Sequence, residues 1–314
     1  MSVIKQRKSL QSDMVRRKIW PYFFCSFFFI FYILFSLYPT LYSFYISLHD
    51  WNGIKPMKYI GFQNYVDLLT KDKEFWPSLW VTLRISLLAI VGQVCVGMVL
   101  AVILFNLRRA KRVYQTIFFA PYIISSVAIA IIMRYFFEWE NGYLNAMLVR
   151  LGLITDHIYW LQTEKYVAPI LTFVNIWRSA GYSMVIFLAS MTAIPEDIYA
   201  AAKVDGANVW QTFWRITIPE LKPMITFIVL TSIISGLQFF ELPSMMYASA
   251  TRVEGASLGG PNHAAFTVMW KFYADTFQRK MRLGYGAATT YVLFVLILVV
   301  TIVTNMFTGR KEDA

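Results

Sequence analysis

Cysteine and histidine are scarce in this sequence, and the motifs of nucleotide chemistry are missing. Its 314 residues include 2 cysteines and 3 histidines. Cys25 and Cys95 fall inside long apolar runs and the histidines are scattered, so neither a disulfide framework nor a metal site is supported. Gly-Lys-Ser and Gly-Lys-Thr do not occur, so the phosphate-binding loop that ATP hydrolysis needs is absent. Without a triad, a carboxylate pair or a zinc signature, we expect the chain not to be an enzyme.

Charged residues are also scarce. They make up 15% of the chain, whereas 58% is hydrophobic and 18% is aromatic, which is too apolar for a soluble globule. Several nearly charge-free runs reach the ~20 residues that cross a hydrocarbon core of ~30 Å. We predict an all-α polytopic membrane protein with six transmembrane helices, over 20–48, 85–107, 113–133, 166–194, 223–240 and 283–309.

The positions of the cations predict the orientation of these spans. Lysine and arginine near a span are retained on the cytoplasmic side, and they cluster before the first span, between the second and third, and after the last. Both termini are therefore expected in the cytoplasm. Arg279, Lys280 and Arg282 would lie outside against this rule, but their loop is long and the first span usually dominates. Because this pattern accounts for about half of the cations, the net charge of +11 does not indicate nucleic-acid binding.

A polar stretch at 194–223, IPEDIYAAAKVDGANVWQTFWRITIPELKP, separates the fourth and fifth predicted spans. It has the pattern of two short helices. Pro195 suits the first turn of the first helix, and Gly206 suits the left-handed residue that ends it. Asn208 can cap the second helix, which we expect to end at Pro219.

This stretch resembles the cytoplasmic coupling loop of permease subunits in ATP-binding-cassette importers, above all the sugar branch that includes the maltose and glycerol-phosphate permeases. The residues that carry the resemblance are Ala200, Ala201, Ala202, Asp205, Gly206 and Ala207. A Gly-Gly-Pro at 259–261, followed by an aromatic amphipathic helix, is a second match. The alternative for the loop is an amphipathic hairpin on the membrane surface.

The resemblance implies the type I importer permease fold. Residues 76–308 would form a core of five spans with the coupling loop at 194–223. Residues 1–75 would hold the basic cytoplasmic N-terminus, the first span and an outer loop. Residues 309–314 would form a cytoplasmic tail.

The resemblance also implies the function and the partners. The chain would be a permease in a bacterial or archaeal cytoplasmic membrane that moves a carbohydrate by alternating access. The expected carbohydrate is an oligosaccharide. Its partners would be a second permease, two ATPase subunits that bind ATP and Mg²⁺, and an extracytoplasmic solute-binding protein. No cofactor is expected in this chain. The residues that couple to the ATPase would be Ala200, Ala201, Asp205 and Gly206; the family usually has Glu where this chain has Ala200.

Polar side chains at membrane depth predict the substrate site. Asn175, Arg178 and Tyr182 share one helix face, and Thr231, Ser235 and Gln238 share another. Counted from the polar stretch, Arg178 and Gln238 lie at the same depth of about 24 Å, so the two faces can meet across one cavity. Aligned on the coupling loop, the positions that line the sugar site of the maltose permease are Asn175, Arg178, Ser179, Tyr182, Thr231, Ser235 and Gln238.

Several alternatives stay open from sequence. The polar residues can instead bond their own or neighbouring helices, and Arg178 can pair with Glu241. Arg84 and Arg134 can snorkel to the interface, or they can favour an acidic ligand such as a uronate or a sugar phosphate. The rival functions are an ion-gradient-driven secondary transporter, for which no internal repeat is seen, and a membrane-embedded enzyme. Residues alone do not separate a homodimer from a heterodimer.

Overall fold

The computed structural model describes residues 20, 22–107, 109–247 and 258–309. The predicted basic N-terminus and residues 310–314 of the tail lie outside the described residues. Within them the chain is helical, as predicted, apart from one antiparallel pair in which β1 (His49–Asp50) meets β2 (Lys58–Tyr59). The fold is therefore a helical assembly with a small hairpin in the loop after the first span.

Four helices are long and apolar enough to cross a membrane as continuous units. They are Tyr22–Ser47, which contains η1 (Ile33–Leu37) and α2 (Tyr38–Ser47), then α4 (Phe75–Asn106), α8 (Glu164–Ala193) and α15 (Leu283–Gly309). The prediction placed the start of the second span ten residues too late, because Arg84 interrupts the apolar run without ending the helix. The Asp72 carboxylate accepts from the N–H groups of Glu74 and Phe75 at the start of α4.

Two further spans are bent pairs. The α5 helix (Lys111–Ile123) meets α6 (Ser126–Phe136) at 95°, and Val209–Glu220 meets α12 (Lys222–Leu237) at 62°. The predicted third span, 113–133, is therefore not one continuous helix. Ile124 and Ser125 adopt extended backbone angles and break it, whereas Pro121 lies inside α5 without ending it. Six spans result when each bent pair counts as one.

Short helices fill the connections. They are α3 (Gln63–Thr70), α7 (Tyr143–Arg150), α9 (Glu196–Val204), α10 (Val209–Thr212), η2 (Phe213–Thr217), α11 (Ile218–Glu220), α13 (Glu241–Tyr247), η4 (Pro261–His263), α14 (Val268–Tyr273) and η5 (Ala274–Gln278). The predicted turn at 259–261 is confirmed, since Gly259 and Gly260 have φ of +95° and +75°. The aromatic helix after it is also confirmed, as α14 continued by η5.

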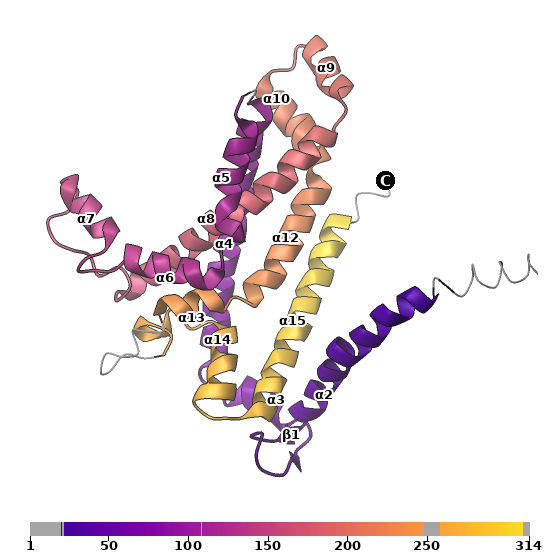
Figure 1. The fold of residues 1–314 in the computed structure, drawn as a ribbon, viewed down its shortest axis with the longest axis vertical. Helices are drawn as coiled ribbons and strands as arrows, with labels where there is room; N and C mark the ends of the chain where they lie inside the picture. The colour runs from indigo at the N-terminus through magenta and orange to yellow at the C-terminus, as the bar shows by residue number, and fades with distance from the viewer. Residues whose placement is uncertain (1–19, 21, 108, 248–257, 310–314) are drawn as a thin grey trace, which may run out of the picture.

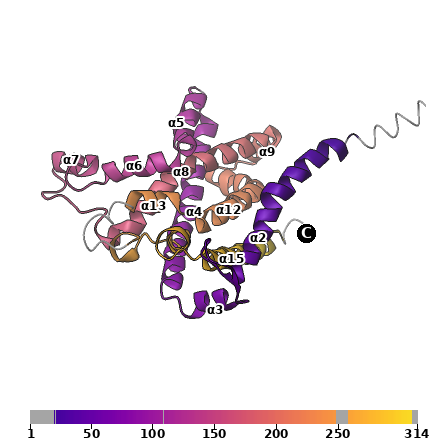
Figure 2. The ribbon, with the colours of Figure 1, turned by 60° about the horizontal axis from the view of Figure 1, so that its bottom comes forward.

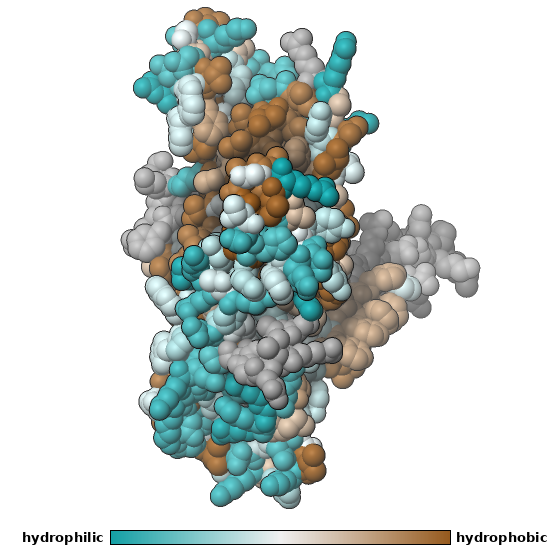
Figure 3. Space-filling view, turned by 90° about the vertical axis from the view of Figure 1, so that its left-hand side faces the viewer, coloured by the Kyte–Doolittle hydropathy of each residue, from teal (hydrophilic) through white to brown (hydrophobic). Residues whose placement is uncertain are grey.

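The long helices run between two ends of the molecule (Figure 1). One end carries α9 and α10, and the other carries β1 and α3. Two elements extend away from the central helices on opposite sides, α7 on one and the Tyr22–Ser47 helix on the other (Figures 1 and 2). On the face that carries α7, a hydrophobic band lies below the α9 end and hydrophilic residues gather again beneath it (Figure 3). Such a band between polar regions is typical of a membrane-crossing protein.

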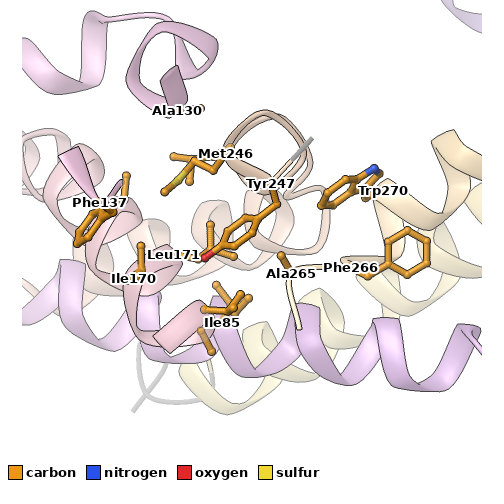
Figure 4. Packing of buried hydrophobic residues seen from close by; sticks show 14 of the residues in the cluster. Ile85, Ala130, Phe137, Ile170, Leu171, Met246, Tyr247, Ala265, Phe266 and Trp270 are labelled. Carbon is orange, nitrogen blue, oxygen red and sulfur yellow. The ribbon is translucent and has the colours of Figure 1, made fainter. Parts of the chain in front are cut away.

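Close helix packing holds the centre together. The α4 helix packs along α8, and α5 also packs against α8. Gly97 lies against Ser183, and Gly181 lies against the backbone of Phe118, so small residues let these helices approach closely. A buried cluster then joins α4, α6, α8, α13 and α14, with the Tyr247 ring between Leu171 and Ala265 (Figure 4).

An ion cluster secures the α3 end. The buried Lys271 Nζ lies 2.6 Å from Asp72 Oδ2 and 2.5 Å from Asp275 Oδ2. Arg279 pairs with Glu74 at 2.7 Å, and the Tyr285 hydroxyl donates to Asp72. The cluster therefore ties the start of α4 to α14, η5 and the start of α15.

Candidate functional site

The predicted coupling stretch forms a helical hairpin at one end of the molecule. The α9 helix ends in a Schellman motif, because the Ala207 N–H donates to Ala202 and the Gly206 N–H donates to Lys203. Gly206 has φ of +77°, so the prediction of a left-handed residue there is confirmed.

The second helix of the hairpin begins as predicted but ends later. Asn208 forms a capping box with Gln211, in which each side chain accepts from the other residue's N–H, at 2.9 and 2.8 Å. Pro195 is the residue before α9 rather than a member of its first turn. Pro219 does not end the helix, which continues to Glu220, because the π-helical turn η2 shifts the hydrogen bonds before the proline is reached.

The hairpin forms one side of an open hollow of about 570 Å³. Ala201, Asp205 and Gly206 line it together with Arg215, whereas Ala200 is exposed outside it. Large apolar side chains of the same hairpin are exposed: Val204, Val209 and Trp210 are 87%, 81% and 71% exposed. A hollow edged by exposed hydrophobic side chains has the character of a protein interface.

Most of the predicted substrate residues meet in one cavity between α4, α5, α8 and α12. This polar cavity has a volume of about 320 Å³. It is lined by Ser86, Ala89, Ile90, Gln93, Tyr122, Asn175, Arg178, Ser179, Tyr182, Thr231, Ser232, Ser235, Gly236 and Phe239. All the predicted residues except Gln238 are therefore brought together.

A second space, the lateral cavity, adjoins it. Its volume is about 490 Å³, and Gln238 lines it with Phe240, Glu241 and residues of α15. Arg178 and Ser235 line both cavities, so Arg178 and Gln238 share the lateral cavity. Phe239 also lines both cavities, whereas Trp177 is 41% exposed and lines neither.

Arg178 occupies the boundary between these cavities. Its Nε–H is buried and meets no acceptor among the described residues. The alternative pairing with Glu241 is wrong, since the ion pairs of the described residues do not include one between these two side chains. The guanidinium lies 5.7 Å from the centroid of the Tyr122 ring, which stacks on Tyr182 with centroids 4.7 Å apart.

Some of the lining hydroxyls bond their own helices. Thr231 donates to Phe227, and Ser235 donates to Thr231, each at 2.9 Å. This matches the alternative that such hydroxyls donate to backbone carbonyls of their own helix. Their oxygens can still accept a hydrogen bond from a solute.

Sequence reasoning missed part of the lining. Gln93 donates to Ser232 at 2.5 Å, and Ser86 donates to the Gly236 carbonyl at 2.8 Å. Ser86 and Gln93 are seven residues apart on α4, so the one-face rule used for the fourth and fifth spans would have found them. Tyr122 gave no such signal, because an aromatic residue in an apolar run usually packs against other helices or lipid; it reaches the cavity from α5, which packs against α8.

Arg84 and Arg134 lie apart from both cavities. Arg84 lines a separate hollow of about 480 Å³ with Glu164, Lys165 and Asn262. Arg134 lies in the last turn of α6. Neither cation therefore adds charge to the polar cavity.

Comparison with known proteins places these features in context. A family model described as "Binding-protein-dependent transport system inner membrane component" matches residues 93–312. The chain is 33% identical to the lactose transport system permease protein LacF of Rhizobium radiobacter, over 85% of this chain and 87% of that protein. It is 28% identical to the arabinooligosaccharides transport system permease protein AraP of Bacillus subtilis, over 93% of this chain and 90% of that protein.

A solved structure has the same fold. It is described as a bacterial ABC transporter involved in the import of the acidic polysaccharide alginate, and one of its chains matches with a TM-score of 0.77 and 23% identity. The match covers 96% of this chain and 98% of that one. The predicted type I importer permease fold is therefore confirmed.

Proposed function

The chain belongs to the family of binding-protein-dependent transport system inner membrane components, and on that premise we propose that it is a permease subunit that imports a carbohydrate through the polar cavity. The sugar-transporting relatives named above support the solute class. The expected solute is an oligosaccharide, because the polar and lateral cavities adjoin and extend over several helices.

One observation carries this proposal. The helices that form two walls of the polar cavity are joined to the hairpin by very short links: Ile194 and Pro195 connect α8 to α9, and Leu221 connects α11 to α12. A force on the hairpin therefore moves the residues that face the solute. Closure of an ATPase pair on ATP supplies that force and switches access from one side of the membrane to the other.

The subunit works in an assembly. A second permease completes the pathway, two ATPase subunits dock on the hairpins, and a solute-binding protein delivers the sugar. ATP and Mg²⁺ are held by the ATPase subunits, and this chain catalyses no reaction itself. The hairpin and both termini face the cytoplasm.

Docking of the ATPase uses the hollow of the hairpin. Ala201 and Gly206 allow close approach, and Asp205 supplies a charge at the rim. Because Ala200 replaces the family's usual Glu and lies outside the hollow, the exposed Val204, Val209 and Trp210 provide contact by burial of apolar surface instead.

Substitutions in the hairpin test this proposal. Asp205→Lys reverses the rim charge, and Gly206→Pro removes the left-handed residue that ends α9, since proline fixes φ near −65°. We expect both variants to insert normally, to lose ATP-driven sugar uptake in proteoliposomes by at least about tenfold, and to lose co-purification of the ATPase subunits.

Gly152→Pro is the matched control. Gly152 also has positive φ, +68°, but it follows α7, far from the hairpin (Figure 1). Normal ATP-driven uptake in both hairpin variants would contradict the coupling role. Uptake that needs no ATP but follows a proton or sodium gradient would instead support the secondary transporter.

A further inference from the structure

We propose that Arg178 recognises an anionic group on the transported saccharide, so that this subunit belongs to an importer of acidic sugars. The inference rests on the proposed function, because it names the chemistry of the solute in the same cavities. The anionic group is a carboxylate or a phosphate, both of which a guanidinium can bind with two parallel hydrogen bonds.

The first observation is that Arg178 forms no ion pair with any residue in the described part of the chain. Its side chain lies at the meeting point of the polar and lateral cavities, half-buried, with a buried Nε–H that meets no acceptor among the described residues. A cation at membrane depth is costly unless something compensates it. Because α8 provides this cation at a cavity wall, the compensating acceptor is expected from the contents of the cavity.

The second observation is the distribution of acids around it. Aspartate and glutamate are absent from the described lining of the polar cavity, and Glu241 is the acid that lines the lateral cavity. Glu241 is exposed and lies in the first turn of α13, where the helix N–H groups already favour a negative charge. Arg178 is therefore the charged group that faces a solute in the polar cavity.

The third observation is what surrounds the guanidinium. Asn175 lines the polar cavity and Gln238 the lateral cavity, each together with Arg178, and the amide groups of both can bond sugar hydroxyls. Tyr122 and Tyr182 form a stacked pair on the cavity wall. Aromatic faces beside amides and one cation suit a ring that carries both hydroxyls and a negative charge.

The cavities are also large enough for sugar rings. Their volumes of about 320 and 490 Å³ lie in the range of roughly 300–1,000 Å³ that is usual for small-molecule sites. Arg178 lies where the two cavities adjoin. A charged sugar ring bound there leaves space for one more sugar unit in each cavity.

The test uses the whole importer, with its partner permease, ATPases and binding protein, in proteoliposomes. Its readout is the concentration of saccharide that half-maximally stimulates ATP hydrolysis. The probes are a uronate trisaccharide, its carboxyl-reduced neutral counterpart and a disaccharide phosphate. We expect an anionic probe to stimulate the wild type at lower concentration than the neutral one. The anionic probe that stimulates at the lower concentration shows whether the recognised group is a carboxylate or a phosphate.

Variants then assign the preference to Arg178. Arg178→Gln should raise the half-maximal concentration of the anionic probe at least about tenfold and leave the neutral probe unchanged, because a charge-assisted hydrogen bond is lost. Arg178→Lys should retain part of the preference, since the charge remains without the bidentate geometry. Arg150→Gln removes a cation from α7, outside both cavities, and should change nothing.

Several outcomes would overturn the inference. Neutral saccharides that stimulate the wild type as well as or better than both anionic probes would refute it and leave the proposed function standing. An unchanged ratio of anionic to neutral stimulation in Arg178→Gln, with or without weaker assembly, would show that Arg178 is a packing residue. Absence of stimulation by any saccharide would refute the proposed function as well.

Discussion

Gly181 sets the distance between α5 and α8, two helices that wall the polar cavity. A methyl group added there would lie 2.0 Å from the Phe118 carbonyl oxygen, which belongs to the backbone and cannot move aside. The absence of one side-chain carbon therefore lets the Tyr122 ring of α5 reach Tyr182 of α8.

Gly181→Ala should consequently force the two helices apart. We expect it to lower the stability of the fold by about 1–3 kcal/mol, the usual cost of overpacking. Its thermal denaturation midpoint in detergent measures this loss. Gly92→Ala is the control, since its new methyl would meet the end of the flexible Ile176 side chain and should cost less. Equal midpoints for Gly181→Ala and the wild type would contradict the close approach.

At the level of residues, the sequence predicted where the cavity lies but missed several of the residues that line it. Polar side chains at three- and four-residue steps placed Asn175, Arg178 and Thr231 correctly, because helix periodicity fixes which residues share a face. Gln93 could have been found in the same way. Tyr122 could not, because its position depends on the packing of α5 against α8, which hydrophobicity does not encode. Binding of solute by these residues remains a prediction.

Among the elements, the hairpin depends on how its second helix starts. The helix Val209–Glu220, which α10 begins, is short enough to be only marginally stable alone, so the Asn208 capping box helps to hold its first turn in place.

Asn208→Ala should therefore loosen the start of α10. The expected loss is about 1 kcal/mol of local stability. It should appear as faster hydrogen exchange at the Gln211 amide and as reduced ATP-driven uptake. Asn208→Ser, which retains a capping oxygen, should behave like the wild type. Slow exchange at Gln211 in the alanine variant would mean that packing rather than the cap fixes this helix.

Whole helices were predictable from apolar runs where they are straight, and less so where they bend. The fourth and sixth spans match α8 and α15 to within about two residues at each end, because the length of an apolar run gives the length of a straight membrane-crossing helix. The third span is broken at Ile124 and Ser125, although both residues are compatible with a helix. Beyond the break α6 packs against α13, a tertiary contact that an apolar run does not encode.

For the molecule as a whole, the ion cluster at the α3 end couples stability to pH. The hydrogen bonds from Arg279 lower the pKa of Glu74 below its ordinary value. Burial alone would raise the pKa of Asp72, but hydrogen bonds from Lys271 and Tyr285 outweigh it and lower that pKa too. A carboxylate whose pKa is lower in the folded state stabilises the fold above its unfolded pKa, about 4, and loses this contribution as the pH falls through the folded value.

We therefore expect acid to open the α3 end. The thermal midpoint of the purified importer should be flat between pH 7 and 5 and should fall below about pH 4. Glu74→Gln should lower the midpoint at pH 7 and make the fall at acidic pH shallower, because one titrating contribution is gone. Identical pH profiles for the variant and the wild type would show that the Arg279 pair contributes nothing to stability.

The break between α5 and α6 has a consequence for genetics. A helix that stops leaves its last carbonyls and the next helix's first N–H groups without partners in their own helix, and at membrane depth such groups are tolerated where they face a cavity or other protein. Ser126, the first residue of α6, lines the lateral cavity. We therefore predict that main-chain groups at this break add to the polarity of the lateral cavity, where an alanine scan cannot remove them. A change of solute that involves these groups would have to alter the bend itself.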